Sequence, residues 1–347
     1  MIRGFQSQGM RLASVPPENF IPATFGRLSP ETPVLPGDSS AATAALRDMV
    51  WIDIEAPTHA EEYLIENALG FGIPTREDMQ EIEPSSRIYV EDGVLYLTAQ
   101  VLASPDMKQL MIGPVTFMVQ PARLVTVHYH RPGSFAFFAD WAARHDTPCS
   151  TGIATLLGLM EAMVDRLADI LENEARQLDD LSKTIFDSRK AASDALSGVV
   201  TRIGAAEDRN GKINESLATI QRVLGYLSVP GAVAAKEALK GIDRDQLKSL
   251  IHDVRSLREV AAVQAEKVRF QLDATLGVIN IRQSDIIKVF SVVAFVFLPP
   301  TLIASIYGMN FEHMPELAVK WGYPAALVMM VVSAVAPWMF FRWKKWL

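Results

Sequence analysis

Oxygen-bearing side chains are the chemical groups that this sequence gathers most densely. Seven acidic residues stand from Asp165 to Asp187, and near the C-terminus Asn310, Glu312 and Glu316 follow one another closely, next to the backbone carbonyl of Gly308. Carboxylate, amide and carbonyl oxygens are the ligands that hard divalent cations prefer. The net charge of -7 favours cations as partners, but most acidic helix faces are simply solvated, so for the acidic run a specific ionic role is the alternative to an ordinary solvated face.

Composition and motifs exclude several classes of function. The 347 residues carry a net charge of -7, which argues against nucleic-acid binding because that needs a basic face. Cys149 is the only cysteine, so neither a disulfide nor a multi-cysteine metal site is expected. His128 and His130 have a spacing that could bind a metal, but no further His or Cys supports it, which favours a structural role. We find no nucleophile-base motif and no GxxxxGK[ST] loop, so neither an enzyme nor an organic cofactor is expected.

Two uncharged apolar segments, residues 289–307 and 322–341, each have about the 20 residues that a membrane-spanning helix needs. Burial in a soluble core is the alternative, but little chain remains to cover them. Arg282 and Lys288 precede the first segment and a basic tail follows the second, and basic flanks stay in the cytoplasm. The N-terminus does not look like a signal peptide. We therefore expect a multi-pass protein of the inner (plasma) membrane, in contact with the lipid bilayer, with both termini cytoplasmic.

The rest of the chain predicts an α/β domain followed by long helices. Strands are indicated at 50–57 and 94–103, a helix at 58–70, and a hairpin at 115–130 around a Pro-Ala-Arg turn. Apolar residues then recur at helical spacing, and a run from about Ala234 to the first span has no proline before Pro299. The predicted parts are a cytoplasmic α/β domain (1–145), a helical hairpin and stalk (146–285), two spans (286–308 and 322–341), a loop between them (309–321) and a basic tail (342–347).

The segment after the first span carries a specific resemblance. Tyr307-Gly308-Met309-Asn310, then MPEL at 314–317 and the C-terminal FRWKKWL, closely resemble the CorA family of divalent-cation transport proteins, in its magnesium-transporting branch. VWIDIEAP and residues 73–89 resemble family motifs less sharply. The resemblance implies an α+β membrane protein that assembles as a homopentameric funnel. Its stalk helices would line one central pore, and its second spans would form an outer ring.

The resemblance makes Gly308, Met309 and Asn310 the expected selectivity filter. Mg²⁺ releases its water reluctantly, so neutral oxygens suit a pore that holds the hydrated ion. Five Asn310 side chains with nearby Gly308 carbonyls would form such a ring, and Gly308 can take the left-handed conformation that ends a helix. Glu312 and Glu316 could concentrate cations at the mouth or be ordinary solvated charges.

Steps of three and four residues back along the first span define one helix face. It offers oxygen at Thr301, Ser284, Asn280 and Asp273, with an apolar stretch between them that could gate by dewetting. Family members line their pore at most of these positions. The expected pore-lining residues are Thr301, Leu298, Ala294, Phe290, Ile287, Ser284, Asn280 and Asp273, with Gly277 on the same face.

Regulation by cytoplasmic Mg²⁺ is a further implication of the resemblance. The acidic candidates are Asp78, Glu81 and Glu83, with Asp253 on the stalk. The basic tail residues Arg342, Lys344 and Lys345 would ring the cytoplasmic end of the pore, although membrane anchoring alone explains them equally well.

The expected function is a channel through which Mg²⁺ enters down its electrochemical gradient, so that Mg²⁺ is substrate and regulator. Co²⁺ and Ni²⁺ are further candidates because their hydrated ions are octahedral too. Two alternatives stay open: a zinc transporter of the same architecture, and a non-conducting, tail-anchored metal sensor or scaffold. Comparing Zn²⁺ flux with Mg²⁺ flux distinguishes a zinc transporter from a magnesium transporter. If Asn310→Ala changed no phenotype, the non-conducting sensor or scaffold would be favoured.

Overall fold

The structure is a computed structural model, and it describes residues 1–19, 46, 48–81, 83–103, 110–187, 193–229, 235–310, 315 and 320–344. The chain divides into two compact units. Unit 1 comprises Met1–Lys183 with Thr201–Arg269, and unit 2 comprises Thr184–Val200 with Phe270–Leu347. The segment 29–45, which the sequence predicts to be a loop, lies outside the described residues.

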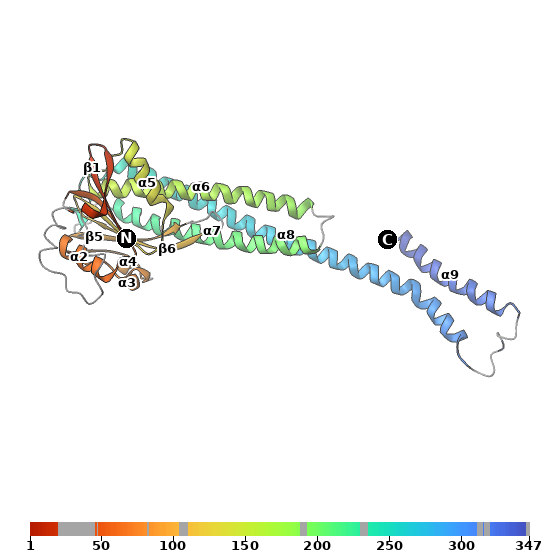
Figure 1. Cartoon of the computed structure of the whole chain (residues 1–347). Helices are drawn as coiled ribbons and strands as arrows, with labels where there is room; N and C mark the ends of the chain where they lie inside the picture. The colour runs from red at the N-terminus through yellow and green to blue at the C-terminus, as the bar shows by residue number, and fades with distance from the viewer. Residues whose placement is uncertain are drawn as a thin grey trace. The chain divides into compact units, whose positions relative to one another are not determined.

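Strands and helices follow the order that the sequence predicts, with an α/β part first and long helices after it (Figure 1). The strands are β1 (Ile2–Gln8), β2 (Arg11–Val15), β3 (Met49–Glu55), β4 (Ile88–Glu91), β5 (Val94–Ala103), β6 (Met111–Val119) and β7 (Leu124–His128). The helices are η1 (Pro17–Asn19), α2 (His59–Leu69), α3 (Arg76–Gln80), α4 (Pro84–Arg87), α5 (Gly133–Arg144), α6 (Gly152–Asp187), α7 (Ser193–Ser228), α8 (Arg244–Tyr307) and α9 (Gly322–Trp343).

The seven strands form one sheet in the order β2-β1-β3-β7-β6-β5-β4. The central pair β3 and β7 is parallel, and every other pair is antiparallel. The predicted hairpin is confirmed, because Val119 pairs with Leu124 across a turn closed by reciprocal hydrogen bonds between Gln120 and Arg123. The parallel centre is covered on both faces, as parallel strands require.

Alternating side chains of the strands build two separate cores. Leu95, Leu97 and Phe117 lie on one face and pack against apolar residues of α5, α6, α7 and the first part of α8. Tyr96 and Met118 lie on the other face and pack with α2 and α3. Within unit 1, α6, α7 and the start of α8 run side by side, as Figure 1 shows. Unit 1 is therefore an α/β domain whose sheet is sandwiched between two helical layers.

A charged network lies inside the sheet at Asp53, whose side chain is completely buried. Its carboxylate accepts hydrogen bonds from the Arg3 guanidinium, from the Thr126 hydroxyl at 2.6 Å and from Nε2 of His128 at 3.0 Å. Burial alone raises the pKa of Asp53. The hydrogen bond and charge of His128, with Arg3 and Thr126, outweigh burial and hold that pKa below its usual value of 3.8.

The same network accounts for the two histidines whose spacing could bind a metal. His128 is fully buried, with its other ring nitrogen against the carbonyl of His130, and Nε2 of His130 lies 2.9 Å from the carbonyl of Val101. Within the described residues, no group of three or more His, Cys, Asp or Glu side chains could hold a metal ion. The structural interpretation of His128 and His130 therefore agrees with their contacts.

Asp53→Asn should lower the free energy of unfolding at pH 7 by about 3 to 5 kcal/mol, because it removes the buried carboxylate that pairs with the Arg3 guanidinium and accepts a hydrogen bond from His128. The folded pKa of Asp53 lies below its unfolded pKa, so its stabilisation is present above about pH 4 and is lost as the pH falls through the folded pKa. Urea titration of the full-length chain in detergent, followed by circular dichroism between pH 3 and pH 7, measures both effects.

The matched control is Asp146→Asn, which breaks the exposed pair between Arg11 and Asp146 at 3.0 Å. An exposed pair contributes at most about 1 kcal/mol. Equal losses in the two variants would contradict the importance of the buried network.

Candidate ion pathway

The helix that carries the predicted pathway, α8, begins later than the sequence indicates. It was expected to start at about Ala234, but it starts at Arg244. Gly241 has a left-handed φ of 83°, which breaks any preceding helical turn. The Asp243 carboxylate then accepts hydrogen bonds from the backbone N–H groups of Asp245 and Gln246, an N-cap that fixes the first turn. From there the helix is continuous to Tyr307, about 100 Å at 1.5 Å per residue.

The apolar end of α8 and the whole of α9 cover little of each other. Only 6% of the most apolar stretch of α8 and 11% of that of α9 are buried within the chain. The contact between them is narrow: Val292, Ala326 and Phe341 are buried, and the rings of Phe295 and Phe341 lie 5.9 Å apart. Such faces need lipid or other chains around them, so burial in a soluble core is excluded for these two helices.

The predicted pore stripe lies on the part of α8 that α9 leaves uncovered. Phe290 is 71% exposed and Leu298 66% exposed, whereas Val292 is 5% exposed. Ala294 is exposed only two residues from Val292, so the stripe and the packed face point in different directions. The stripe residues that are exposed are Asp273, Gly277, Asn280, Ser284, Ile287, Phe290, Ala294, Leu298 and Thr301.

Polar groups occupy the two ends of this stripe. Asp273, Asn280 and Ser284 lie on the side nearer unit 1 along the helix, and Thr301 lies near the helix end. The Thr301 hydroxyl donates to the carbonyl of Phe297 at 2.7 Å, so its lone pairs remain available to accept. Between Ser284 and Thr301, the stripe presents only apolar side chains over about 25 Å of helix. The stripe thus has oxygen at both ends and an apolar middle.

The end of α8 differs from the expectation for Gly308. A left-handed Gly308 was predicted, but its φ lies outside the left-handed region. The Gly308 N–H still bonds to the carbonyl of Ala304 at 2.9 Å, and Met309 bonds to Ile306 at 3.3 Å in a tighter turn. A Cβ at Gly308 would stand 3.1 Å from the Ala304 oxygen. Glycine is therefore favoured there by close backbone approach rather than by positive φ.

Asn310 follows directly after this last turn and is exposed, as are Gly308 and Met309. The Asn310 side chain forms no hydrogen bond within the described part of the chain, so its amide is not used as a helix cap there. Its side-chain carbonyl oxygen can accept hydrogen bonds. Glu312 and Glu316, the predicted cation-attracting residues of the loop, lie outside the described residues.

The predicted regulatory acids of the α3 region have local structural tasks. Asp78 completes a capping box: its carboxylate accepts from the Thr75 N–H at 3.0 Å and from the Thr75 hydroxyl at 2.8 Å. Glu81 is the C-cap of α3, and Glu83 is the N-cap of α4 without a side-chain cap bond. These acids are therefore presented on two short helices at the edge of unit 1.

Asp253 lies exposed on α8 within unit 1, and its charge acts on Asp165, a member of the acidic run that the sequence carries between Asp165 and Asp187. Burial raises the pKa of Asp165, and the charges of Glu161, Asp169 and Asp253 raise it further. The four carboxylates, three on α6 and one on α8, lie close enough together for the charges of the other three to raise the pKa of Asp165. Their spacing of four residues on α6 was the available sequence signal.

The basic tail is only partly described. The Arg342 guanidinium lies 5.2 Å from the ring centre of Trp338, and the Lys344 ammonium lies 5.6 Å from that of Trp343. Both are cation–π contacts on α9 or next to it, typical of residues at a membrane surface. Lys345 lies outside the described residues.

Comparison with known proteins gives consistent matches over nearly the whole chain. The family model described as CorA-like Mg²⁺ transporter protein matches residues 47–345. The magnesium transport protein CorA of Escherichia coli strain K12 is 33% identical over 302 residues, covering 87% of this chain and 93% of that protein. CorA of Salmonella typhimurium is 32% identical over 303 residues, with the same coverage. The complete structure of the CorA magnesium transporter from Methanocaldococcus jannaschii has a TM-score of 0.71 at 16% identity, covering 100% of this chain and 99% of that one.

Single cysteines can test which face of α8 meets water. Burial raises the pKa of the native Cys149 thiol to about 11, so it should stay unreactive at neutral pH. With divalent cations removed by a chelator, Ala294→Cys should react with a membrane-impermeant thiol reagent, whereas Val292→Cys should not. Mass spectrometry of the labelled protein measures both.

Native protein with only Cys149 serves as the background, and Val293→Cys samples an exposed face between the two test positions. Equal labelling at 292, 293 and 294, or labelling at 293 without labelling at 294, would contradict a water-lined stripe.

Proposed function

The chain belongs to the family of CorA-like Mg²⁺ transporter proteins, and on that basis we propose how its own residues carry the ion. Magnesium transport is its function, and the protein is a membrane transporter with two C-terminal spans rather than an enzyme. The predicted family, the α/β domain followed by a long stalk helix and C-terminal apolar helices, and magnesium transport are thereby confirmed. The residue assignments that follow are proposals.

The observation that carries the assignment is the position of Asn310. Its exposed amide follows the last turn of the helix whose uncovered stripe is the proposed pore wall. Gly308, Met309 and Asn310 form the proposed selectivity filter, with the Asn310 side-chain oxygens and the Gly308 carbonyls accepting hydrogen bonds from water around the ion. Neutral acceptors suit this task because Mg²⁺ keeps its water shell and must leave again.

Below the filter, the proposed path follows the stripe of α8. Thr301 offers the next oxygen, Leu298 to Ile287 form an apolar stretch, and Ser284, Asn280 and Asp273 offer oxygens beyond it. An apolar stretch loses its water when it narrows, so a small movement of the helices closes it. Transport needs no nucleotide, because an inside-negative potential favours entry of a divalent ion by about 4.6 kcal/mol per 100 mV.

We place the protein in the inner (plasma) membrane with both termini in the cytoplasm. Lys288 and Arg282 precede the first apolar segment, and Arg342, Lys344 and Lys345 end the second, as cytoplasmic flanks do. Assembly as a homopentamer is supported by the low burial of both spans and by the exposed stripe, since one α8 cannot enclose a pore. In that assembly Glu312 and Glu316 would attract cations to the outer mouth.

Closure by cytoplasmic Mg²⁺ is proposed to involve Asp253, together with Asp78, Glu81 and Glu83. Asp253 is exposed and adds its charge to that of Glu161, Asp165 and Asp169, so a bound cation would relieve repulsion there. Asp78 already caps α3, which leaves it fewer free lone pairs than Asp253 has. A regulating ion has to bind the closed state better than the open one.

Co²⁺ and Ni²⁺ are proposed as further cargo because their hydrated ions share the octahedral shape of hydrated Mg²⁺. The zinc alternative is disfavoured because the curated relatives, whose similarity covers 87% of this chain, are named magnesium transport proteins. The same similarity disfavours a non-conducting sensor or scaffold.

Asn310→Ala should reduce Mg²⁺ entry into proteoliposomes by at least about tenfold, equivalent to 1.4 kcal/mol, because it removes the acceptor ring. Liposomes with a Mg²⁺-sensitive dye, low internal Mg²⁺ and an imposed inside-negative potential measure the rate. Asn67→Ala, an exposed asparagine of α2 in unit 1, is the control and should transport normally.

Equal flux in all three proteins would remove Asn310 from the filter while leaving transport intact. Flux of Zn²⁺ but not Mg²⁺ through the native chain would revive the zinc alternative.

Asp253→Asn should raise the internal Mg²⁺ concentration needed for half-maximal closure severalfold, about 1 kcal/mol of lost coupling. Flux measured at a series of internal Mg²⁺ concentrations reports this shift. Asp245→Asn, on the first turn of the same helix, is the matched control. Coinciding inhibition curves for native protein and both variants would place the sensor elsewhere.

A further inference from the structure

A groove in unit 1, between α5 and α6, combines two side-chain ladders of different chemistry. α5 contributes aromatic rings and α6 contributes carboxylates, and each ladder repeats every four residues. Four residues advance a helix by about 6 Å. The two ladders therefore have matching repeats on facing helices.

The aromatic ladder consists of Phe137 and Trp141, continued by His145. The rings of Phe137 and Trp141 are stacked with centres 6.1 Å apart, and those of Trp141 and His145 with centres 3.7 Å apart. Phe137 is 57% exposed and Trp141 48% exposed, although large rings favour burial. The fold thus holds ordered aromatic faces at the surface.

The carboxylate ladder consists of Glu161, Asp165 and Asp169, all exposed. Glu161 accepts one hydrogen bond, from the Gln246 side chain at 2.9 Å, and no cation pairs with Asp165 within the described part of the chain. Burial and the three neighbouring carboxylates raise the pKa of Asp165. Among the described residues, no ion pair is formed with these three carboxylates, so the ladder carries negative charge there.

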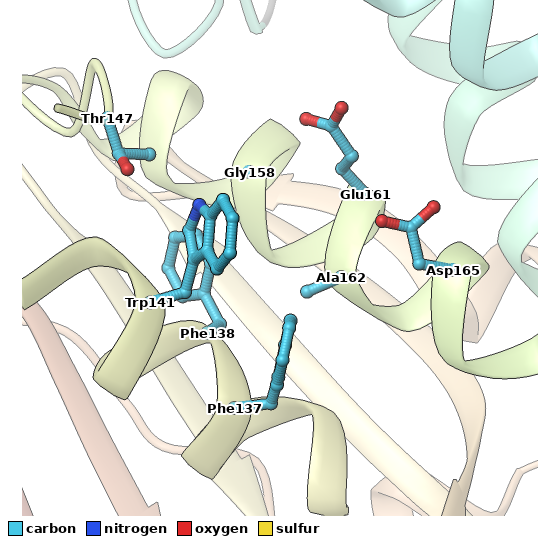
Figure 2. A pocket seen from close by; sticks show the side chains of 8 residues that line it. All are labelled: Phe137, Phe138, Trp141, Thr147, Gly158, Glu161, Ala162 and Asp165. Carbon is cyan, nitrogen blue, oxygen red and sulfur yellow. The ribbon is translucent and has the colours of Figure 1, made fainter. Parts of the chain in front are cut away.

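Two adjoining hollows, each of about 220 Å³, join the ladders into one groove. Phe137, Ala162 and Asp165 line both. Figure 2 shows the Phe137 and Trp141 rings rising from one helix, Glu161 and Asp165 projecting from the other, and Ala162 between them. Gly158 lets the Phe138 ring pack directly against α6 beneath the groove, since a Cβ there would stand 2.8 Å from that ring.

The lining distinguishes among cations. Hydrated Mg²⁺ has no affinity for an apolar ring face that offers no hydrogen-bond acceptor, and the described residues include no metal-holding cluster. An ammonium group on an aliphatic chain can interact with each kind of side chain in this lining. Its charge pairs with the carboxylates and the ring faces, and its methylene groups pack against the apolar side chains.

We propose that the groove between α5 and α6 binds a linear aliphatic polyamine, with its ammonium groups at Asp165 and Glu161 and its methylene chain along Phe137 and Trp141. Ammonium groups separated by three or four methylenes lie about 5 to 6 Å apart, close to the repeat of both ladders. Arg166 also lines the second hollow. Its single positive charge is outnumbered by the carboxylates of Asp165 and its three neighbours Glu161, Asp169 and Asp253, so the net charge favours a cation. This binding is measured without transport.

Equilibrium dialysis of radiolabelled spermidine against the full-length protein in detergent tests the proposal. We expect saturable binding of one spermidine per chain. Asp165→Asn and Trp141→Ala should each weaken it at least about tenfold, and Trp141→Phe should restore most of it, because a ring face is retained. Asp180→Asn removes an exposed carboxylate of α6 far along the helix, and it should leave binding unchanged.

Circular dichroism and thermal unfolding confirm that each variant is folded, which the exposure of Asp165 and Trp141 favours. Absence of saturable binding to the native chain would overturn the proposal. So would equal weakening by Asp165→Asn and Asp180→Asn with no effect of Trp141→Ala, because spermidine would then be held only by diffuse negative charge.

Discussion

Every peptide group in the membrane-spanning part of α8 has to find its hydrogen-bond partner inside the helix, because hydrocarbon offers none. This constraint keeps the membrane-spanning part of α8 continuous to Tyr307, so side chains are what the proposed pore wall offers to a passing ion. Pro299 and Pro300 are the exception: without N–H groups, they leave the carbonyls of Phe295 and Val296 without their usual donors. That is where α8 bends most readily, about two turns before the helix end and beside the apolar stretch of the stripe.

The distribution of charge follows from the properties of the ion. The stripe and residues 308–310 present amides, hydroxyls and backbone carbonyls. The single carboxylate of the stripe, Asp273, lies far along the helix from the proposed filter. A full charge beside a hydrated divalent ion would strengthen binding and slow release. Carboxylates gather instead on α6 and at Asp253 in unit 1, where slow, reversible binding suits regulation.

Much of this architecture could be predicted from the sequence, because its signals are local and periodic. The hairpin at 115–130 and both apolar helices are of this kind. The start of α8 was missed because a single left-handed Gly241 and the Asp243 cap, rather than any change in apolar pattern, set it. The left-handed conformation expected for Gly308 does not occur, because glycine is also favoured where the backbone approaches closely, as it does here. Asp53 was missed because its partners, Arg3 and His128, are distant in sequence and meet only through strand pairing.

Two different ways of holding a cation thus follow from two different kinds of surroundings in one chain. Next to the membrane, neutral oxygens on exposed helix ends suit an ion that keeps its water, since hydrogen bonds to that water can be exchanged quickly. In the α5 and α6 groove, ring faces remove water from one side of a ligand while carboxylates supply charge on the other. A cation that keeps its water shell gains little from the rings, whereas an organic ammonium ion can place its charge against a ring face and its methylene groups against apolar surface. Selectivity between the two classes of cation therefore depends on the surface beside the oxygen, not on the number of oxygens.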